Sequence, residues 1–290
     1  MRPEDTGREA VSKPHPEAAN QTPARTGDFM RLLQSAGYSF PASPTREPTV
    51  CTTAGHAQVQ EAHGTTVIAV KYKNGVLNVG DRRATAATAI MYDRAEKVLP
   101  LDDHTLIAIA GSYARAMEVV RYLRHSFKYY ARTQLQEMSL DGKVNELARA
   151  ISANLTSALQ GIGAFLPILS AWDKEANEGR IFFYDAMGAR FESAEFAAAG
   201  SGAERIRGAF DYIVRTKKPF TSMSLEEALA ECLILLDIAA DLDAATGGYT
   251  KIPPVARAVT ANGILDIDEP KLREVVRALV AAPALKAGED

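Results

Sequence analysis

Cysteine and histidine are scarce in this sequence, with two and five residues among 290. Cys51 lies near the N-terminus and Cys232 lies in an apolar run, so the pair gives no disulfide framework, and Cys232 is predicted to be a small buried residue. Three of the histidines precede residue 65, which leaves His104 and His125 for the rest of the chain. Two histidines are too few for a His-rich zinc site and argue against a His-based catalytic triad, so we expect no metal.

Long apolar runs and basic stripes are also missing. No run approaches the roughly 20 residues that a membrane span needs. The formal net charge is -3 and the pI is near 6.0, so nucleic acid is not an expected partner. Residues 1–6 are polar and lead into no apolar stretch, so a secretory signal is not supported and we expect a cytoplasmic protein. Hydrophobic residues make up 47% of the chain, enough for a sizeable core.

The N-terminal stretch differs in composition from the rest. Residues 1–60 hold seven of the 14 prolines, with many small and polar residues and no sustained periodicity. Such a stretch cannot bury enough apolar surface to form a core. We therefore predict a largely disordered leader over residues 1–64, a domain over residues 65–281 and a flexible tail over residues 282–290.

A β-hairpin is predicted at the start of the domain. Alternating apolar residues predict strands over 66–72 and 76–79, and Asn74-Gly75 between them is the signature of a type I′ turn. A turn centred there pairs Thr65 with Ala84. It brings Asp81 and Thr85 to within about 10 Å of Thr65, given a rise of about 3.3 Å per residue.

Blocks of strands alternate with pairs of helices along the rest of the domain. A sheet buried on both faces needs cover, so this order predicts an α+β fold in which two sheets face each other with helices outside, a four-layer αββα sandwich. Strands are expected over 88–92, 97–99, 105–111, 166–171, 180–184, 191–192, 255–260 and 264–266, and helices over 112–132, 139–159, 203–214, 224–241 and from 270.

The junction between Gly64 and Thr65 is a candidate cleavage site. A threonine hydroxyl is a weak nucleophile until a base accepts its proton. A cut before Thr65 would supply that base, because the new α-amino group has a pKa of about 8 and belongs to the same residue. Gly64 lacks a Cβ, so the backbone can reach the strained geometry in which Thr65 Oγ attacks the preceding carbonyl. Alone, Gly-Thr-Thr could equally open a strand, so the interpretation depends on residues further along the chain.

Three residues have informative sequence separations from Thr65. Asp81 lies 16 residues after Thr65, Lys97 lies 32 residues after it, and Gly111 lies 46 residues after it. With these spacings, the chain from residue 63 to about 281 resembles a β subunit of the 20S proteasome of the bacterial kind. The resemblance implies the αββα fold of the N-terminal-nucleophile hydrolases and a threonine protease.

The resemblance also implies a role for each of these residues. Thr65 matches the nucleophile, Asp81 and Lys97 match its partners, and Gly111 matches the oxyanion-hole glycine. A lysine held between an aspartate and the hydroxyl would lower the pKa of the hydroxyl, and the Gly111 N–H could face the developing oxyanion. Taken singly, Lys97 could be a surface lysine, Asp81 a turn residue and Gly111 a tight turn.

Two further motifs match the family. Ser201-Gly202 matches its serine and glycine, and Asp243 with Thr246 matches its Asp-x-x-Ser/Thr-Gly motif, with threonine where many relatives have serine. Asp243, Thr246 and Ser201 could together support the α-amino group of Thr65. The alternative for Asp243 is a simple helix C-terminal turn finished by two glycines.

A specificity pocket is implied by the same resemblance. None of its residues is charged, so an apolar side chain before the cut would gain from burial and a charged one would lose its hydration. The alternative is that these residues are ordinary core. The residues are Ala84, Thr85, Ala95, Leu99, Ile109, Tyr113 and Met117.

The function implied is hydrolysis of peptide bonds in unfolded polypeptides, after removal of the leader by autocleavage. The implied partners are α subunits and other β subunits in four stacked seven-membered rings, with an ATP-dependent unfolding ring upstream. No metal or organic cofactor is expected, since nucleophile and base both belong to Thr65. Two alternatives stay open: a structural β subunit that does not cleave, against which the intact Thr65, Asp81 and Lys97 argue, and a small-molecule amidase of the same nucleophile class.

Overall fold

The chain divides into two units, Met1–Ala57 and Gln58–Asp290. The computed structural model describes residues 65–86, 89–160, 163–249 and 252–281, all of which lie in the second unit. The predicted leader over residues 1–64, with Gly64 and Cys51, and the predicted tail over residues 282–290 lie outside the described residues.

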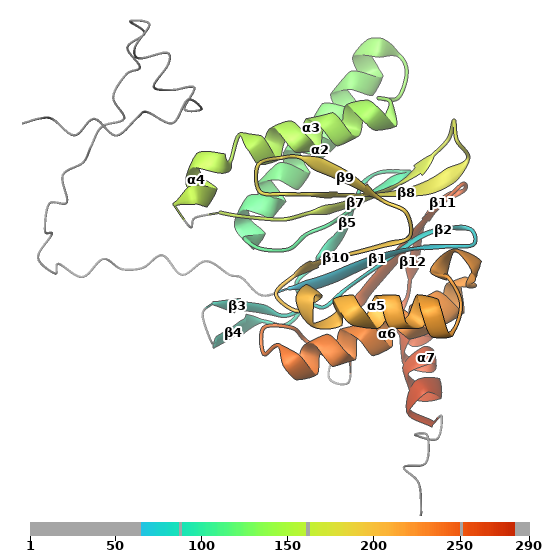
Figure 1. Ribbon diagram of the computed structural model, residues 1–290. Coiled ribbons are helices and arrows are strands. Elements are labelled where there is room, and N and C mark those ends of the chain that lie inside the picture. Colours follow the sequence, from blue (N-terminus) through green and yellow to red (C-terminus); the bar gives the residue numbers. More distant parts are fainter. Residues whose placement is uncertain (1–64, 87–88, 161–162, 250–251, 282–290) are drawn as a thin grey trace, which may run out of the picture. The chain divides into compact units, whose positions relative to one another are not determined.

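Two five-stranded antiparallel sheets form the centre of the described unit. The first has the strand order β10-β1-β2-β11-β12, and the second has the order β5-β6-β7-β8-β9. A separate pair, β3 and β4, forms a small hairpin beside them (Figure 1). The strands are β1 Thr66–Tyr72, β2 Gly75–Gly80, β3 Ala84–Ala86, β4 Ala89–Tyr92, β5 Val98–Asp102, β6 Thr105–Ala108, β7 Ile168–Asp173, β8 Glu178–Tyr184, β9 Arg190–Ser193, β10 Phe196–Gly200, β11 Val255–Thr260 and β12 Gly263–Ile267.

Helices cover both outer faces of the sheets. Ser224 and Glu227 form the reciprocal capping box that opens α6, which confirms the start predicted there. No described helix is both long enough and apolar enough to span a membrane. The helices are α2 Tyr113–Gln134, α3 Leu140–Ser152, α4 Leu155–Leu159, α5 Ala203–Thr216, the short 3-10 helix η1 Phe220–Ser222, α6 Leu225–Leu242 and α7 Glu269–Ala281.

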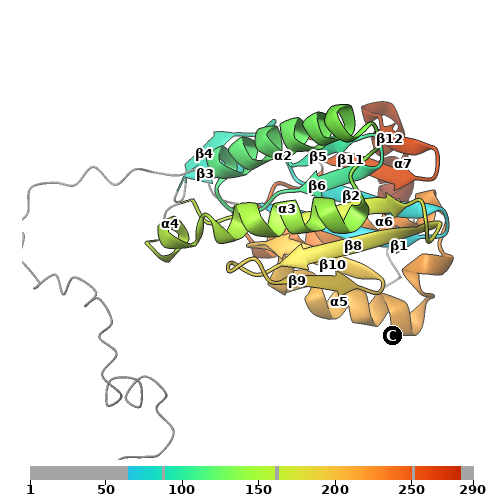
Figure 2. The same ribbon diagram turned by 90° about the horizontal axis from the view of Figure 1, so that it is seen from above.

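The alternation of side chains along β1 and β6 shows how the layers stack. Ile68 and Val70 point outward into a cluster formed with α5, α6 and α7, whereas Val67 and Ala69 point inward to the second sheet. On the second sheet, Ile107 packs outward against α2 and α3. The order of layers is therefore helices, sheet, sheet, helices, as Figure 1 shows, and Figure 2 looks down on α2 and α3 with the strands behind them. The predicted α+β, four-layer αββα sandwich is confirmed.

The predicted register of the first hairpin was wrong. β1 and β2 pair Tyr72 with Gly75 and Val67 with Gly80, so the turn is one residue earlier than predicted and the expected pairing of Thr65 with Ala84 does not occur. Neither Asn74 nor Gly75 has the positive φ of a type I′ turn. The structure gives Gly75 another role, because a Cβ on it would lie 2.1 Å from the carbonyl oxygen of Val259 in β11.

Two other elements differ from the sequence prediction. The helix expected over residues 139–159 breaks into α3 and α4, and at the break the buried Asn154 side chain donates to the carbonyl of Gly163 at 2.6 Å. Asparagine is a weak helix former, and here its side chain is committed to the later segment at Gly163. Strand β10 was not predicted, because its sequence Phe-Ala-Ala-Ala-Gly shows no polar alternation and alanine favours helix.

The close approach at Gly75 gives a testable prediction. Gly75→Ala should destabilise the chain by about 1–3 kcal/mol, since the added methyl group meets backbone that cannot move aside cheaply. Gly208→Ala is the matched control, because a Cβ on this residue of α5 meets nothing within 4 Å. It should be neutral or stabilising by up to about 1 kcal/mol. Urea unfolding of both variants measures the difference, and equal stability would contradict the packing at Gly75.

Candidate active site

Thr65 lies directly before β1 and is buried, with 5% of its surface exposed. The backbone of Gly200, the last residue of β10, packs against it. A Cβ on Gly200 would lie 1.9 Å from the Thr65 carbonyl oxygen, and Gly200 has a φ of +107°, which favours glycine. The end of β10 is thus shaped to hold Thr65 in place.

A buried ion pair lies beside Thr65. Lys97 Nζ is 2.7 Å from Asp81 Oδ1, and each residue is 1% exposed. Lys97 also donates to the carbonyl of Arg83. Asp81 follows β2 in the first sheet and Lys97 precedes β5 in the second, so the pair joins the ends of two strands that face each other. Lys97 is therefore not a surface lysine.

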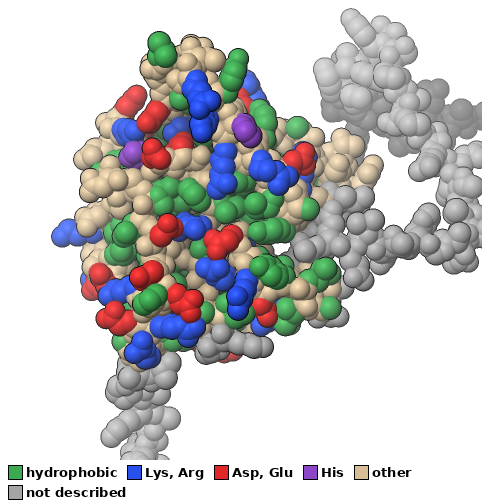
Figure 3. Space-filling view, turned by 180° about the vertical axis from the view of Figure 1, so that it is seen from behind, with side chains coloured by type: hydrophobic (Ala, Val, Ile, Leu, Met, Phe, Trp, Pro, Cys, Tyr) green, Lys and Arg blue, Asp and Glu red, His purple; other side chains and the backbone are tan. Residues whose placement is uncertain are grey.

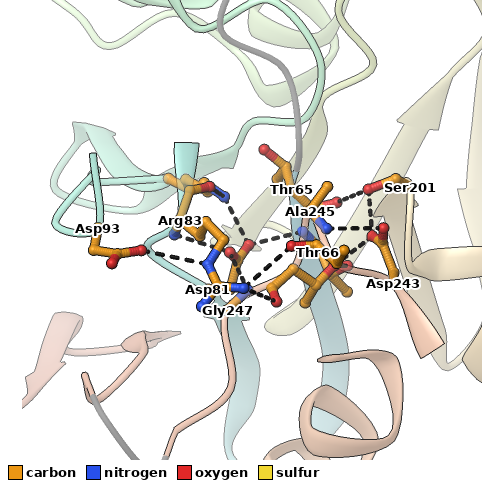
Figure 4. Close-up of polar contacts among 12 residues, drawn as sticks. Thr65, Thr66, Asp81, Arg83, Asp93, Ser201, Asp243, Ala245 and Gly247 are labelled. Atoms are coloured by element: carbon orange, nitrogen blue, oxygen red, sulfur yellow. Dashed lines mark hydrogen bonds and ion pairs between the residues drawn. The ribbon is translucent and has the colours of Figure 1, made fainter. Parts of the chain in front are cut away.

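Asp81 accepts hydrogen bonds from several segments of the chain. Its Oδ1 accepts from the Thr66 N–H at 2.8 Å as well as from Lys97. Its Oδ2 accepts from the N–H groups of Arg83 and Gly247, both at 2.9 Å. Figure 4 shows Thr66, Arg83 and Gly247 around the Asp81 carboxylate. An ionised carboxylate needs such donors when it is removed from water.

Burial lowers the pKa of Lys97, and the charge of Asp81 together with its hydrogen bond opposes this effect without cancelling it. The lysine is thereby moved toward the range in which an amine can exchange a proton at moderate pH.

A second polar group includes Ser201, Asp243 and Thr246. Asp243 Oδ2 accepts from Ser201 Oγ at 2.5 Å and from Thr246 Oγ1 at 2.7 Å. Ser201 Oγ also lies 3.4 Å from the Thr65 carbonyl oxygen. Burial raises the pKa of Asp243, but the hydrogen bonds from Ser201, Thr246 and the Ala245 N–H outweigh it and hold the pKa below its usual value. Asp243 also ends α6 as its C-cap.

Gly111 has the backbone geometry that only glycine adopts easily. Its φ is +94°, and a Cβ on it would lie 2.4 Å from the Ala164 carbonyl oxygen. The Ala110 carbonyl accepts from the Leu166 N–H at 2.9 Å. Within the same trans peptide the Gly111 N–H points the opposite way, toward the side on which the Ile109 N–H donates to the Lys97 carbonyl. The Gly111 N–H therefore points to the Lys97 side of β6.

The predicted pocket residues fall into two groups. Ala84 and Thr85 lie in β3, Ala95 follows β4, and all three are buried. Leu99 and Ile109 belong to the core cluster between the second sheet and helices α2 and α3, with Tyr113 and Met117 packed against it. Burial raises the pKa of the Tyr113 hydroxyl, and a hydrogen bond from the Glu96 backbone opposes the shift, so Tyr113 reaches the residue next to Ala95. A pocket formed by both groups remains a prediction.

Two residues of the site were not identified from the sequence. The Thr66 hydroxyl lies 2.7 Å from Thr246 Oγ1, while its N–H binds Asp81. Arg83 donates from Nη1 to the carbonyls of Ala244 and Thr246 at 3.1 and 3.3 Å. Thr66 resembles an ordinary strand residue in the sequence, and only its position beside Thr65 could have drawn attention to it.

Across the described ranges, no group of three or more His, Cys, Asp and Glu side chains is arranged to hold a metal ion. Cys232 is fully buried in α6, as predicted, and burial raises the pKa of its thiol.

Comparison with known proteins gives concordant matches. The family described as "Proteasome subunit" matches residues 61–252. "Proteasome subunit beta 2" of Thermomonospora curvata is 36% identical over 261 residues, covering 89% of each chain. "Proteasome subunit beta" of Acidothermus cellulolyticus is 38% identical over 242 residues, covering 81% of each chain. The protein of the same name from Jonesia denitrificans is 37% identical over 213 residues, which is 72% of this chain and 68% of the relative.

Proposed function

Because the chain belongs to the proteasome β-subunit family, we propose that it is a threonine-type endopeptidase that hydrolyses peptide bonds of unfolded polypeptides. The observation that carries the proposal is the buried Asp81–Lys97 pair beside Thr65. Burying two charges costs several kcal/mol per ion unless close pairing and further hydrogen bonds offset the cost. A lowered lysine pKa in such a pair is typical of groups that take part in proton transfer.

The proposed mechanism begins with removal of residues 1–64. Thr65 Oγ attacks the Gly64 carbonyl, the C–N bond between Gly64 and Thr65 breaks, and the hydroxyl proton goes to the leaving nitrogen, which becomes the free Thr65 amine. Water then hydrolyses the ester, which releases residues 1–64 and restores the Thr65 hydroxyl. In each later cycle, Thr65 Oγ attacks the substrate carbonyl and the α-amino group accepts the hydroxyl proton. The amine of the leaving peptide receives that proton, and water then hydrolyses the ester.

The other site residues support these steps. The Lys97 ammonium, held by Asp81, lowers the pKa of the Thr65 hydroxyl and so favours its deprotonation. The Gly111 N–H donates to the oxyanion that develops on the substrate carbonyl. Asp243 is held ionised by its hydrogen bonds, so its charge and the Ser201 hydroxyl stabilise the protonated α-amino group.

The two alternatives have less support. Family membership and the names of the relatives argue against a small-molecule amidase. A structural subunit that does not cleave would need neither the buried Asp81–Lys97 pair nor the contacts around Thr65. Replacing such a pair with apolar residues is often neutral or stabilising, so a non-cleaving subunit gains little by keeping it.

The chain assembles with other proteasome subunits, as its family implies. The partners proposed in detail are α subunits and further β subunits in four stacked seven-membered rings, fed in the cytoplasm by an ATP-dependent unfolding ring. Apolar side chains gather on the face seen in Figure 3. On β4, Ile90, Met91 and Tyr92 are each more than half exposed. Clustered exposed apolar side chains of this kind mark interaction surfaces.

Autocleavage predicts where the mature protein begins. In the assembled particle, intact mass spectrometry should detect a chain that starts at Thr65. Thr65→Ala should keep residues 1–64 because it has no hydroxyl to attack the Gly64 carbonyl, whereas Thr65→Ser should still be processed. A different mature start, or loss of the leader from the Thr65→Ala protein, would show that Thr65 does not perform the cleavage.

Lys97 is predicted to be required for turnover. Lys97→Ala should lower peptide hydrolysis by roughly 10²–10⁴-fold, since the Thr65 hydroxyl then loses its nearby ammonium group. Lys143→Ala is the matched control, because Lys143 is also buried and paired with an aspartate, Asp102, at 2.8 Å. This control should lose stability but keep the turnover of the folded protein. The measurement requires particles in which leader removal has been verified, and near-normal turnover in Lys97→Ala would refute the role.

The uncharged pocket residues predict specificity. Fluorogenic peptides with Tyr or Leu before the cut should be cleaved much faster than matched peptides with Arg or Glu. An apolar side chain gains about 25 cal/mol for each Å² it buries, and a charged one would lose hydration without a partner. Rates that are equal or reversed would mean that the pocket is formed by other residues.

A further inference from the structure

We propose that Thr66 is a positioning residue whose hydroxyl, through Thr246 and Asp243, fixes the backbone next to the nucleophile; the inference rests on the function proposed above. Three hydroxyl groups and one carboxylate lie in a continuous chain of contacts. Thr66 Oγ1 and Thr246 Oγ1 are 2.7 Å apart, Thr246 Oγ1 is 2.7 Å from Asp243 Oδ2, and Ser201 Oγ is 2.5 Å from the same oxygen.

The direction of the hydrogen bonds is determined by the number of protons. An ionised carboxylate only accepts, so Thr246 must donate its single hydroxyl proton to Asp243. Thr246 then has no proton left for Thr66. The contact of 2.7 Å between the two threonines is therefore a hydrogen bond donated by Thr66. Chains of hydrogen bonds that end on an ion polarise one another and strengthen each member.

Thr66 is held from two sides. Its N–H donates to Asp81 Oδ1, and its hydroxyl donates to Thr246. Gly247, which follows Thr246 in the sequence, donates its N–H to Asp81 Oδ2. Thr66, Asp81, Gly247 and Thr246 thus form a closed ring of contacts, in which Thr66 and Thr246 have no exposed surface. Figure 4 shows Thr66 between the Asp81 group and the Asp243 group.

The glycine at position 202 leaves room for this hydroxyl. A Cβ there would lie 2.3 Å from Thr66 Oγ1 and 2.9 Å from Thr246 Oγ1. Any other residue at position 202 would displace the hydroxyl pair. The backbone before α5 is thus fitted to the Thr66–Thr246 hydrogen bond as well as to Thr65 itself.

Holding Thr66 matters because it shares a peptide unit with the nucleophile. A displacement of about 1 Å can cost about 10²-fold in rate, even when it originates away from the reacting atoms. Thr66 is held by two hydrogen bonds, so the loss of one of them should lower the rate by less than this. We expect Thr66→Val, which keeps the shape and removes the hydroxyl, to lower kcat about tenfold with little change in KM. Thr66→Ser, which keeps the hydroxyl, should retain most of kcat.

The experiment compares assembled wild-type, Thr66→Val and Thr66→Ser proteins on one fluorogenic peptide ending in Tyr or Leu, after mass spectrometry has verified that each begins at Thr65. Thr105→Val is the matched control, because Thr105 is also fully buried and its hydroxyl accepts from Lys143, away from the site. It should keep wild-type kcat. A kcat in Thr66→Val within twofold of wild type, or no recovery in Thr66→Ser, overturns the proposal.

A double-mutant cycle with Thr246→Val tests the hydrogen-bond chain directly. Because the two hydroxyls act through one bond, the double variant should be no slower than about the slower single variant. Independent, multiplying losses would overturn the inference. If Thr66→Val does not assemble, Thr246→Val and Thr246→Ser take its place, and recovery of kcat in the serine variant alone supports the chain. A wild-type particle that cleaves no peptide refutes the proposed function and this inference with it, whereas normal cleavage by Thr66→Val refutes only the inference.

Discussion

The rest of the site depends on the buried ion pair between the Asp81 carboxylate and Lys97. An isolated ion of this size would cost of order 20 kcal/mol in an idealised apolar medium, and several kcal/mol in a real protein. Asp81 offsets this cost with Lys97 and with three backbone N–H groups, from Thr66, Arg83 and Gly247. The start of β1, the loop after β2, the start of β5 and the loop after α6 must therefore all be in place before the ion pair is stable.

Glycines allow these segments to come close enough. Gly200 and Gly202 have no room for a Cβ against Thr65 and Thr66, and Gly111 has none against Ala164. At Gly200 and Gly111 backbone packs directly on backbone, and at Gly202 it packs on the Thr66 and Thr246 hydroxyls. Side chains reach it from strand ends and loops, while the apolar clusters between the sheets and under the helices hold those ends in position. Such an arrangement suits a reaction that requires fixed placement of the reacting atoms.

The sequence predicted the layers and most long elements because apolar alternation and helix caps are local signals. It did not predict the register of the first hairpin. Gly75 packs closely against the distant strand β11, and no local sequence pattern indicates that contact. Strand β10 was missed for a related reason, since its alanines favour helix and tertiary pairing with β1 overrides that preference. Asp81, Lys97 and Asp243 were identified through family spacing. Thr66 was not, because its hydroxyl contact is visible only once residue 246, 180 positions away, lies beside it.

The contacts of the site are present in a chain in which Thr65 is joined to residue 64 by a peptide bond. Asp81 already binds Lys97 and the Thr66 N–H, and Asp243 already binds Ser201 and Thr246. None of these bonds uses the α-amino group that a cut would create. The proposed cleavage before Thr65 would therefore add one group, the free amine, to a framework whose other parts are in place. In the proposed mechanism, a single set of contacts serves both the cleavage of the chain itself and, afterwards, the cleavage of other chains.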